Sequence, residues 1–416
     1  MYGLIGKGLS HSFSKEIHES LGNLNYNIYN LTDLDSFIRN NELLGFNITM
    51  PYKTEIIKCI QQMDSISKET NSINTVVNRN GIYYGYNTDY YGFVELIKFY
   101  NIKIENKRVL VLGNGSVAKT VIYALKRMNA RKIKVLARRI IDKDEDLLEN
   151  YDKYLDFDCL INTTPVGMYP NNEEYLPLDL TLFENLKIVI DLIYNPINTN
   201  LLLEAKKQGI KAYNGFFMLI MQAKRAHEIF FDVDIPNNLA IKIYYRLLKK
   251  MYNLVFIGLP LSGKSKYSNL ISDKLNKSLF DMDNEIEKKH KMSIPDFFKK
   301  YSEEVFRKEE TTLIKNIYKK QNLTISTGGG VIENSKNIEL LKQNGVIIFL
   351  NKDPNQIAKK EIFGRPLIKS AHDVLNLAKK RIPLYINACD ILIDIDKDTV
   401  YHMYEIEEKF NEYINY

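Results

Sequence analysis

Two glycine-rich loops of different design constrain what this chain can fold into. The stretch "GNGSVA" occupies residues 113–118, and "GLPLSGKS" occupies residues 258–265. Each loop follows an unbroken apolar run and precedes a segment with helical patterning. Such a run, ended by a glycine turn, is typical of a strand buried on both faces of a parallel sheet. The sequence therefore predicts an α/β chain with two separate nucleotide-binding halves.

The length and charge of the chain limit its partners. Its 416 residues suggest two to four folding units, and a hydrophobic content of 45% is ordinary for a protein with a sizeable core. The net charge of +6 is small, and basic and acidic residues are interleaved without a basic block, so we expect no nucleic-acid partner. The apolar runs are far shorter than the ~20 residues that cross a bilayer. We expect small-molecule substrates, no membrane partner and no obligate protein partner.

The cysteine pattern indicates a reducing compartment. Three cysteines occur, Cys59, Cys159 and Cys389, and none has a neighbour at zinc-ligand spacing. A sparse, odd set is typical of reduced thiols. The chain opens on the apolar run 2–6, without a basic leader. We therefore expect a first strand there instead of a signal peptide, and a cytoplasmic protein.

Apolar periodicity and turn dipeptides place the main elements. Asn80-Gly81 separates two alternating runs and predicts a hairpin. From Lys107 the pattern is strand, glycine turn, helix and strand, and at Asn253 it restarts without a Pro/Gly/Ser-rich linker. The expected strands lie within 2–6, 44–53, 71–89, 108–113, 132–138, 159–164, 188–193, 254–258, 324–330 and 346–350, and the expected helices within 13–22, 117–130, 200–209, 216–231, 238–251 and 266–276.

The first loop fits the pattern G-x-G-x-x-A. Its fixed positions are Gly113, Gly115 and Ala118, with Ser116 and Val117 between them. The first glycine permits a tight turn, the second lets the backbone approach a pyrophosphate, and the small third residue lets the helix pack closely on the strand. A plain glycine turn could also join a strand to a helix, but the flanking elements favour a dinucleotide site at the helix N-terminus.

The end of the following strand distinguishes the two nicotinamide cofactors. Proteins that bind NAD place an acidic residue there, which holds the ribose 2′-hydroxyl. This chain has Arg138 and Arg139 instead, and guanidinium groups suit a 2′-phosphate. We therefore expect NADPH, although two solvated arginines at a strand end would give the same sequence.

Hydroxyl and charged side chains gather in the first 100 residues. Ser12 and Ser14 stand on either side of Phe13, just before an expected helix. Thr49 and Lys53 surround a proline turn. The two serines could bind a polyol or a carboxylate, or they could cap the helix, and by themselves they favour the cap.

A set of motifs runs in order along the first half of the chain: S-x-S, N-x-T-x-P-x-K, I-N-T, N-T-D, G-x-G-x-x-A, "INTTPVGM" (161–168), "DLIYNP" (191–196) and G-x-x-M-L-x-x-Q (215–222). From residue 2 to about residue 250 this set resembles shikimate dehydrogenase. The resemblance implies reversible, NADPH-dependent reduction of 3-dehydroshikimate to shikimate. It also implies two lobes within 1–250, a substrate lobe (1–88 and 222–250) and a Rossmann NADP lobe (89–221).

The same resemblance implies roles for single residues. Lys53 and Asp89 would be the catalytic pair beside the carbonyl carbon, where the protein supplies a proton to the alkoxide that hydride transfer creates. The sequence does not tell which of the two delivers the proton. The residues implied to hold the substrate are Ser12, Ser14, Thr49, Asn74 and Gln222, and those implied to border the nicotinamide are Tyr194 and Gly215.

Four positions in this half depart from the family pattern. Lys15 replaces the proline that usually follows the second serine. Tyr90 and Tyr91 follow the N-T-D aspartate, where glycine is common, and Phe217 stands where glycine is frequent. These changes concern loop geometry and affinity more than the reaction.

The second loop has the form G-x-x-x-x-G-K-S, which is typical of a phosphate-binding loop. Its backbone amides cradle phosphates, Lys264 reaches the terminal phosphates, and Ser265 ligates magnesium. The remaining expected contacts to ATP are Gly258, Ser262 and Gly263.

Five further segments follow this loop: "FDMDNEIE" with Asp281 and Asp283, "EEVFRKEE" with Arg307, "STGGG", "GRPLI" with Arg365, and "KRIPLY" with Arg381. Taken singly, the aspartates could mark an exposed strand end and Arg307 a solvated helix face. Together and in this order, residues 253 to about 395 resemble shikimate kinase. The expected cofactors of this half are ATP and Mg²⁺.

The kinase resemblance implies transfer of the γ-phosphate of ATP to the 3-hydroxyl of shikimate. Asp283 would contact that hydroxyl as the base, and Arg307 and Arg381 would pair with the substrate carboxylate. Positioning and charge neutralisation would supply most of the rate. The other implied contacts are the magnesium partner Asp281, the lid residue Arg365, and the glycines Gly328, Gly329 and Gly330, which let the substrate approach the backbone.

Two positions depart from the kinase pattern. Leu261 stands where the family loop has another glycine, and Ser302 where a glycine usually precedes the acidic pair. Leu261 matters more, because a side chain there would crowd the phosphate cradle. The lid is also slightly short.

The two resemblances describe consecutive reactions. The first half would make shikimate, and a P-loop kinase domain at 253–416 would phosphorylate it, so the chain resembles a fusion of the two families. Two alternatives stay open. One half could have lost catalysis and serve as a metabolite sensor or scaffold, or the dehydrogenase half could prefer quinate or NAD.

Overall fold

The computed structural model of the chain describes residues 1–9, 12–22, 25–40, 42–359, 370–396 and 398–415. The chain divides into two compact units. Unit 1 comprises Met1–Asn195 and Thr199–Tyr244, and unit 2 comprises Pro196–Asn198 and Tyr245–Tyr416. The division falls inside helix α8 (Asn237–Met251). The lobe boundaries at 88/89 and 221/222 stay a prediction.

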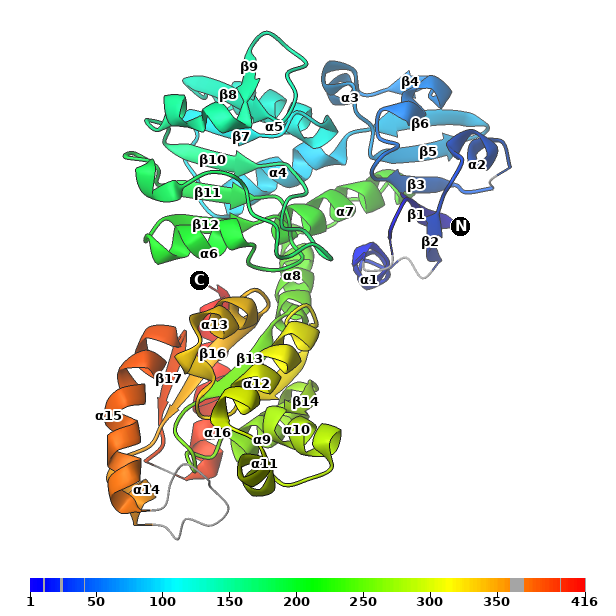
Figure 1. Cartoon of the computed structure of the whole chain (residues 1–416). Coiled ribbons are helices and arrows are strands. Elements are labelled where there is room, and N and C mark those ends of the chain that lie inside the picture. Colours follow the sequence, from blue (N-terminus) through cyan, green and yellow to red (C-terminus); the bar gives the residue numbers. More distant parts are fainter. Residues whose placement is uncertain (10–11, 23–24, 41, 360–369, 397, 416) are drawn as a thin grey trace. The chain divides into compact units, whose positions relative to one another are not determined.

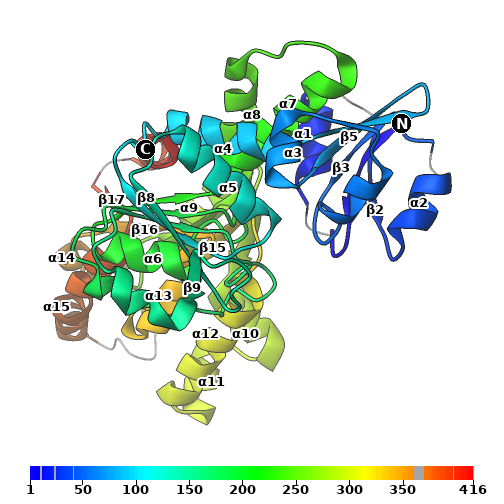
Figure 2. The same cartoon turned by 90° about the horizontal axis from the view of Figure 1, so that it is seen from above.

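The first sheet of unit 1 is mixed. Its strand order is β2-β1-β3-β5-β6-β4, with β5 antiparallel to both β3 and β6. Helix α2 lies beside this sheet (Figure 2). Its Leu34 and Phe37 belong to the same apolar cluster as strand residues such as Phe46. The strands are β1 (Tyr2–Gly6), β2 (Tyr26–Asn30), β3 (Gly45–Ile48), β4 (Gln62–Met63), β5 (Thr75–Arg79) and β6 (Ile82–Tyr86), and the helices are α1 (Ser14–Ser20), α2 (Leu34–Asn40) and α3 (Ser65–Thr70).

The second sheet of unit 1 is entirely parallel, in the order β12-β11-β10-β7-β8-β9 (Figure 1). The direction of winding reverses between β7 and β10. In open parallel sheets, ligands bind outside the carboxyl ends of the strands at such a reversal. The strands are β7 (Arg108–Leu112), β8 (Lys132–Ala137), β9 (Glu145–Leu147), β10 (Cys159–Asn162), β11 (Ile188–Asp191) and β12 (Lys211–Asn214), and the helices are α5 (Ser116–Arg127) and α6 (Asn200–Lys207).

Two helices of unit 1, α4 (Thr88–Phe99) and α7 (Phe216–Phe231), cross at close range. A Cβ atom built on Gly92 would lie 2.6 Å from the Met218 carbonyl oxygen and 3.0 Å from Gln222. Only glycine therefore permits this approach. The crossing brings the first turn of α4, with Asp89, beside Gln222 on α7.

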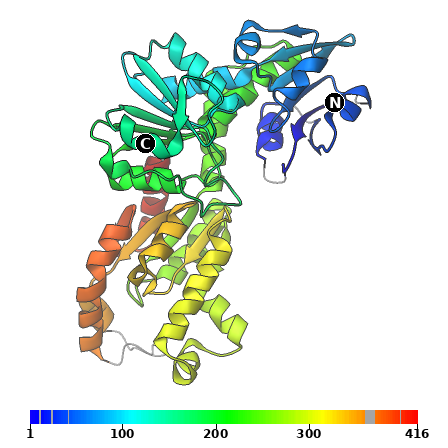
Figure 3. The same cartoon turned by 45° about the horizontal axis from the view of Figure 1, so that its top comes forward.

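Unit 2 is built on a five-stranded parallel sheet in the order β14-β15-β13-β16-β17. Helices α12 (yellow) and α15 (orange) lie with these strands between them in the view of Figure 3. The strands are β13 (Asn253–Ile257), β14 (Ser278–Asp281), β15 (Leu323–Ser326), β16 (Gly345–Asn351) and β17 (Ile391–Asp394). The helices are α9 (Lys264–Leu275), α10 (Met282–His290), α11 (Ile294–Lys300), α12 (Glu303–Ile317), α13 (Ser335–Lys342), α14 (Pro354–Ala358), α15 (Ala371–Ala388) and α16 (Thr399–Asn415).

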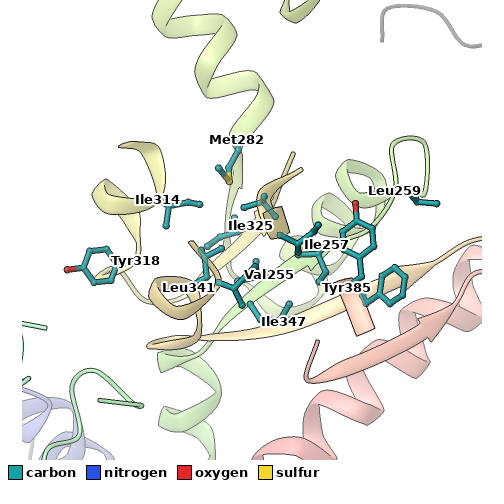
Figure 4. Packing of buried hydrophobic residues seen from close by; sticks show 14 of the residues in the cluster. Val255, Ile257, Leu259, Met282, Ile314, Tyr318, Ile325, Leu341, Ile347 and Tyr385 are labelled. Atoms are coloured by element: carbon teal, nitrogen blue, oxygen red, sulfur yellow. The ribbon is translucent and has the colours of Figure 1, made fainter. Parts of the chain in front are cut away.

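The core of unit 2 fills the space between this sheet and its helices. Val255 and Ile257 of β13 pack with Ile347 of β16, and Tyr385 of α15 lies in the same cluster (Figure 4). Tyr385 also stacks on Phe349 with ring centroids 5.0 Å apart. The cluster anchors the strand that feeds the phosphate-binding loop.

The predicted fold class is confirmed. Asn80 and Gly81 have φ of 54° and 84°, as a two-residue hairpin turn requires, and the helix expected at 216–231 has those bounds. Strand β12 was not predicted, because its sequence "KAYN" is too short and too polar to give a strand signal. Within the described residues, no helix combines the length and apolar character needed to cross a bilayer.

Candidate active sites

Four predicted residues of unit 1 meet in one buried cluster. Lys53 Nζ donates to Asp89 Oδ2 at 2.5 Å, and their side chains are 10% and 7% exposed. Asn74 Nδ2 donates to Asp89 Oδ1 at 2.9 Å and to Gln222 Oε1 at 2.8 Å. Both carboxylate oxygens of Asp89 are thus held, and the lysine and the two amides converge on one place.

The orientation of Asn74 follows from its neighbours. Its Oδ1 accepts from the Thr88 backbone N–H at 2.7 Å, at the start of α4, so its Nδ2 faces Asp89. Behind it, Asn47 Nδ2 donates to Thr75 Oγ1 at 3.0 Å, and Tyr26 donates to Asn47 Oδ1 at 2.8 Å. Sequence reasoning missed Asn47 and Tyr26, although Asn47 opens the N-x-T-x-P-x-K motif.

Ser12 and Ser14 hydrogen-bond to each other at the start of helix α1, where Ser12 is half-buried and Ser14 is buried. Ser12 Oγ accepts from the backbone N–H of Ser14, the first residue of α1, at 3.2 Å, and donates to Ser14 Oγ at 3.1 Å. Ser12 thus accepts one backbone N–H of the first helical turn, but the N-cap residue of α1 is Phe13, which has no side-chain capping hydrogen bond. Phe13, between them, meets Tyr194 edge-on with ring centroids 6.3 Å apart. Thr49 follows β3 directly.

The dinucleotide loop lies between β7 and α5, as predicted. Gly113 has φ of +98°, and Ala118 is fully buried against the sheet. Gly115 immediately precedes α5, whose first two residues are Ser116 and Val117. These features fit a bound pyrophosphate at the start of the helix.

Arg138 and Arg139 are exposed just beyond β8. Asn114 connects the glycine loop to this arginine turn, because its Nδ2 donates to the Arg139 carbonyl and to Glu145 Oε2, each at 2.9 Å. The arrangement fits a cofactor that carries a 2′-phosphate. At the other end of the site, a Cβ on Gly215 would lie 2.0 Å from the Leu192 carbonyl oxygen, so glycine brings α7 against the loop that holds Tyr194.

Burial raises the pKa of Tyr194 to about 12, so its hydroxyl stays protonated.

The residues that depart from the family pattern pack against other side chains of unit 1. Tyr90 meets Tyr123 edge-on, Tyr91 accepts from Lys224 Nζ at 3.1 Å, and Phe217 stacks on a neighbouring phenylalanine at 3.9 Å. Lys15 pairs with exposed Glu19.

The phosphate-binding loop of unit 2 joins β13 to α9. Lys264 Nζ donates to the carbonyl oxygens of Gly258 and Leu259, each at 3.0 Å. Gly258 and Gly263 have φ of 147° and 100°. The Lys264 ammonium therefore folds back onto the loop and is held by two of the loop's backbone carbonyls.

The two residues predicted to serve magnesium lie together. Ser265 Oγ donates to Asp281 Oδ2 at 2.7 Å and lies 3.1 Å from Ser326 Oγ. Such oxygen ligands suit Mg²⁺, which takes few ligands from protein and the rest from phosphate and water. Within the described residues, no group of three or more His, Cys, Asp or Glu could hold a metal ion. Ser262 Oγ, buried in the loop, has no partner within the described part of the chain.

Both predicted carboxylate-binding arginines are paired with glutamates. Arg307 donates to Glu310 Oε2 at 2.5 Å and to Glu303 Oε1 at 2.9 Å. Arg381, 3% exposed, donates through Nε to Glu333 Oε1 at 3.1 Å. Burial raises the pKa of Glu310 against the opposing pull of Arg307.

The three glycines after β15 fit between these groups. A Cβ on Gly328 would lie 2.1 Å from Glu310 Oε1, and one on Gly330 would lie 2.2 Å from the Arg307 guanidinium. A Cβ on Gly329 would lie 3.1 Å from Pro260 of the phosphate loop. Gly328 and Gly330 therefore leave room for the protein's own Glu310 and Arg307, a role that sequence reasoning did not foresee.

Other predicted positions have different outcomes. Asp283 lies in the first turn of α10, and its charge acts on Glu310. Arg365 lies outside the described residues. Sequence reasoning missed Glu310, Glu333 and Tyr385. Glu310 stands three residues after Arg307 and Tyr385 four after Arg381, which is the spacing of neighbours on one helix face and the only available signal.

These arrangements define the class of protein: a dehydrogenase with a dinucleotide-binding fold, joined in one chain to a P-loop kinase. Comparison with known proteins gives the families. The profile of the shikimate dehydrogenase substrate binding domain matches residues 4–76, and that of shikimate kinase matches residues 260–415.

Relatives and solved structures agree with the first profile. A shikimate dehydrogenase (NADP(+)) of Clostridium perfringens is 32% identical over 266 residues, covering 59% of this chain and 98% of the relative. One of Clostridium botulinum is 37% identical over 248 residues, covering 54% and 93%. The crystal structure of a chorismate mutase/shikimate 5-dehydrogenase fusion protein from Clostridium acetobutylicum is 32% identical with a TM-score of 0.55, covering 60% of this chain and 97% of that one. A shikimate dehydrogenase solved in complex with NADP+ is 29% identical with a TM-score of 0.51, covering 58% and 93%.

The chain belongs to the shikimate dehydrogenase family, and its C-terminal part carries a shikimate kinase domain. The chain is thus an enzyme that combines a dehydrogenase and a kinase domain in one polypeptide.

Proposed function

We propose that the chain reduces 3-dehydroshikimate to shikimate with NADPH and then phosphorylates the 3-hydroxyl of shikimate with ATP. One observation carries the proposal: two unlike nucleotide loops occur in one chain, each with its own polar substrate cluster. The proposed product of unit 1 is the proposed substrate of unit 2. The sparse, unpaired cysteines favour operation in the cytoplasm.

In unit 1, bound NADPH supplies the hydride, and the chain handles the proton. Lys53 and Asp89 share a hydrogen bond and can pass a proton to the substrate oxygen. Asn74 and Gln222 offer amide groups to the substrate hydroxyls beside this pair. The remaining proposed substrate ligands are Ser12, Ser14 and Thr49, with Tyr194 and Gly215 next to the nicotinamide.

In unit 2, Asp283 accepts the proton of the 3-hydroxyl as the oxygen bonds to the γ-phosphorus and ADP leaves. Arg307 and Arg381 bind the substrate carboxylate. Lys264 exchanges its backbone acceptors for the phosphates of ATP. Ser265 and Asp281 would hold Mg²⁺, which neutralises charge on the phosphates.

The test is a product time course. The full chain is incubated with 3-dehydroshikimate, NADPH and Mg-ATP, and products are followed by mass spectrometry. We expect shikimate first and shikimate 3-phosphate second. Lys53→Met should abolish both products from 3-dehydroshikimate but still phosphorylate added shikimate, whereas Lys264→Met should stop at shikimate. Faster turnover of quinate, or of NADH, would overturn the substrate or cofactor assignment. A wild-type chain that forms neither product would contradict the proposal.

A further inference from the structure

Tyr385 connects the two ligand-binding loops of unit 2. Its phenol donates toward the carbonyl of Gly258, at 2.9 Å, and toward the carbonyl of Gly329. Gly258 opens the phosphate-binding loop, and Gly329 is the middle glycine after β15. One hydroxyl proton is therefore shared between a loop for ATP and a loop for shikimate.

The two loops also touch directly. Pro260 of the phosphate loop lies 3.1 Å from the position of a Cβ on Gly329. They arise from different strands, β13 and β15, which pair in parallel through residues 254–256 and 324–326. Sheet hydrogen bonds fix the strands, but each loop begins beyond the last paired residue. The Tyr385 hydroxyl is a fixed tie between them past the end of the sheet.

The surroundings of Tyr385 hold this tie in place. The side chain is fully buried, and its ring stacks on Phe349 of β16 within the core cluster (Figure 4). Burial also raises the pKa of the phenol above its usual value, so it remains a donor. Tyr385 stands one helical turn after Arg381 on α15, and thus the same helix face carries a proposed substrate ligand and the tie between the loops.

We propose that Tyr385 is a positioning residue for phosphoryl transfer, which sets the γ-phosphate in line with the substrate hydroxyl by fixing the phosphate loop relative to the glycine loop. This rests on the proposed kinase function. Each loop binds its own ligand through its own groups, so the tie contributes to the distance and angle between the ligands. A misplacement of about 1 Å between reacting groups can cost about 100-fold in rate.

The test is Tyr385→Phe in the full chain, which keeps the stacked ring and removes only the hydroxyl. The matched control is Tyr318→Phe, the same change in the same core cluster, at the end of α12. Binding of shikimate and of MgADP is measured by calorimetry, because the chain has no tryptophan to report it by fluorescence. Kinase kcat and KM, the temperature of half-inactivation, and the dehydrogenase rate are measured on the same samples.

We expect kinase kcat to fall by about 30-fold or more in Tyr385→Phe, with both Kd values within about twofold of wild type. Tyr318→Phe should retain the wild-type kcat, and the dehydrogenase rate should be unchanged in both. A kcat within threefold of wild type would overturn the inference. So would a kcat that falls in parallel with both affinities and with the inactivation temperature. A wild-type chain that binds MgADP but not shikimate would instead overturn the proposed function, and this inference with it.

Discussion

The charged groups of the two active sites are partnered in different ways. In unit 1 the lysine and aspartate assigned to catalysis bind each other, and Asn74 binds the same aspartate. In unit 2 the cations assigned to ligands bind acceptors that have no proposed part in proton or phosphoryl transfer: Lys264 binds backbone carbonyls, Arg307 binds Glu303 and Glu310, and Arg381 binds Glu333.

The difference follows from what each reaction requires. Unit 1 moves one proton and one hydride, so a buried pair that is already assembled can act without rearranging. Under the proposed function, unit 2 receives two anionic ligands, ATP and a monocarboxylate. Its cations need acceptors until those ligands bind, since an unpaired buried charge is costly. Unit 1 is therefore built for proton transfer and unit 2 for exchange of partners.

The largest expected effect breaks the pair in unit 1. Lys53→Met should lower dehydrogenase kcat by about 1,000-fold, because it removes a proton donor that also binds Asp89. NADPH oxidation at saturating substrate measures it. Kinase activity of the same sample is the control for folding, and a loss below tenfold would contradict the assignment of Lys53.

The second prediction removes the buried carboxylate that pairs with Arg307 in unit 2. Glu310→Gln should destabilise unit 2 by about 3 kcal/mol, because it leaves the half-buried Arg307 guanidinium without its buried counter-charge. The temperature at which kinase activity is half lost measures this. Glu303→Gln is the matched control: it changes the exposed partner of the same arginine and should cost less than about 0.5 kcal/mol. Equal effects of the two would show that burial of the pair does not matter.

The third prediction concerns acid. Burial, with a smaller contribution from nearby His227, lowers the pKa of His18 to about 3, whereas unfolded histidine has a pKa of about 6.5. The unfolded chain therefore binds more protons between these values, and stability falls as the pH drops from about 6.5 toward 3. At pH 5 the loss from His18 should be about 2 kcal/mol.

His18→Phe tests this, because it keeps a ring stacked on Tyr26 and removes the titrating group. The inactivation temperature of dehydrogenase activity should fall less between pH 7 and pH 5 in the variant than in the wild type, by about 6 °C. The inactivation temperature of kinase activity should change by the same amount between pH 7 and pH 5 in the variant and in the wild type. An identical pH dependence of dehydrogenase inactivation would refute the role of His18.

The smallest effect concerns the departure in the phosphate loop. Leu261 has φ of +66°, a left-handed conformation, and its side chain packs partly on the core of unit 2. Leu261→Gly should be more stable than Leu261→Ala by about 1 kcal/mol, since both lose the packing but only alanine keeps the backbone strain. Kinase inactivation temperatures give the difference. ATP KM should stay within threefold in both, and a tenfold drop in Leu261→Gly would show that the side chain crowds the cradle.

Motifs with a fixed local geometry could be predicted from the sequence. Gly113 and Gly115 sit in the turn that the pattern requires, and Ala118 lies in the first turn of the helix that follows. The lysine, amides and aspartate of unit 1 meet although Lys53 and Gln222 are far apart in sequence. Each of these belongs to a motif whose spacing reflects a strand end or a helix start. The elements on which they stand also had clear apolar periodicity.

Residues that act through tertiary contact could not be predicted. The segment "EEVFRKEE" reads as a solvated helix face, yet Glu310 is fully buried while Glu304 is exposed. The local sequence does not distinguish the buried glutamate from the exposed one. The burial of Glu310 depends on the loop containing Gly328 and Gly330, which lies against Glu310 and Arg307. Tyr385 likewise has no local feature that distinguishes it from other helix residues. Its role depends on contacts of its hydroxyl with two loops that are distant in sequence.

The paired arginines of unit 2 have a consequence for the response to ionic strength. A substrate carboxylate that reaches Arg381 replaces or joins the carboxylate of Glu333, so an existing ion pair is exchanged for another. Arg381 is 3% exposed, so added salt screens either ion pair only weakly. The KM for shikimate in unit 2 is therefore expected to change little with salt, because Arg381 is paired with a carboxylate both before and after the substrate binds.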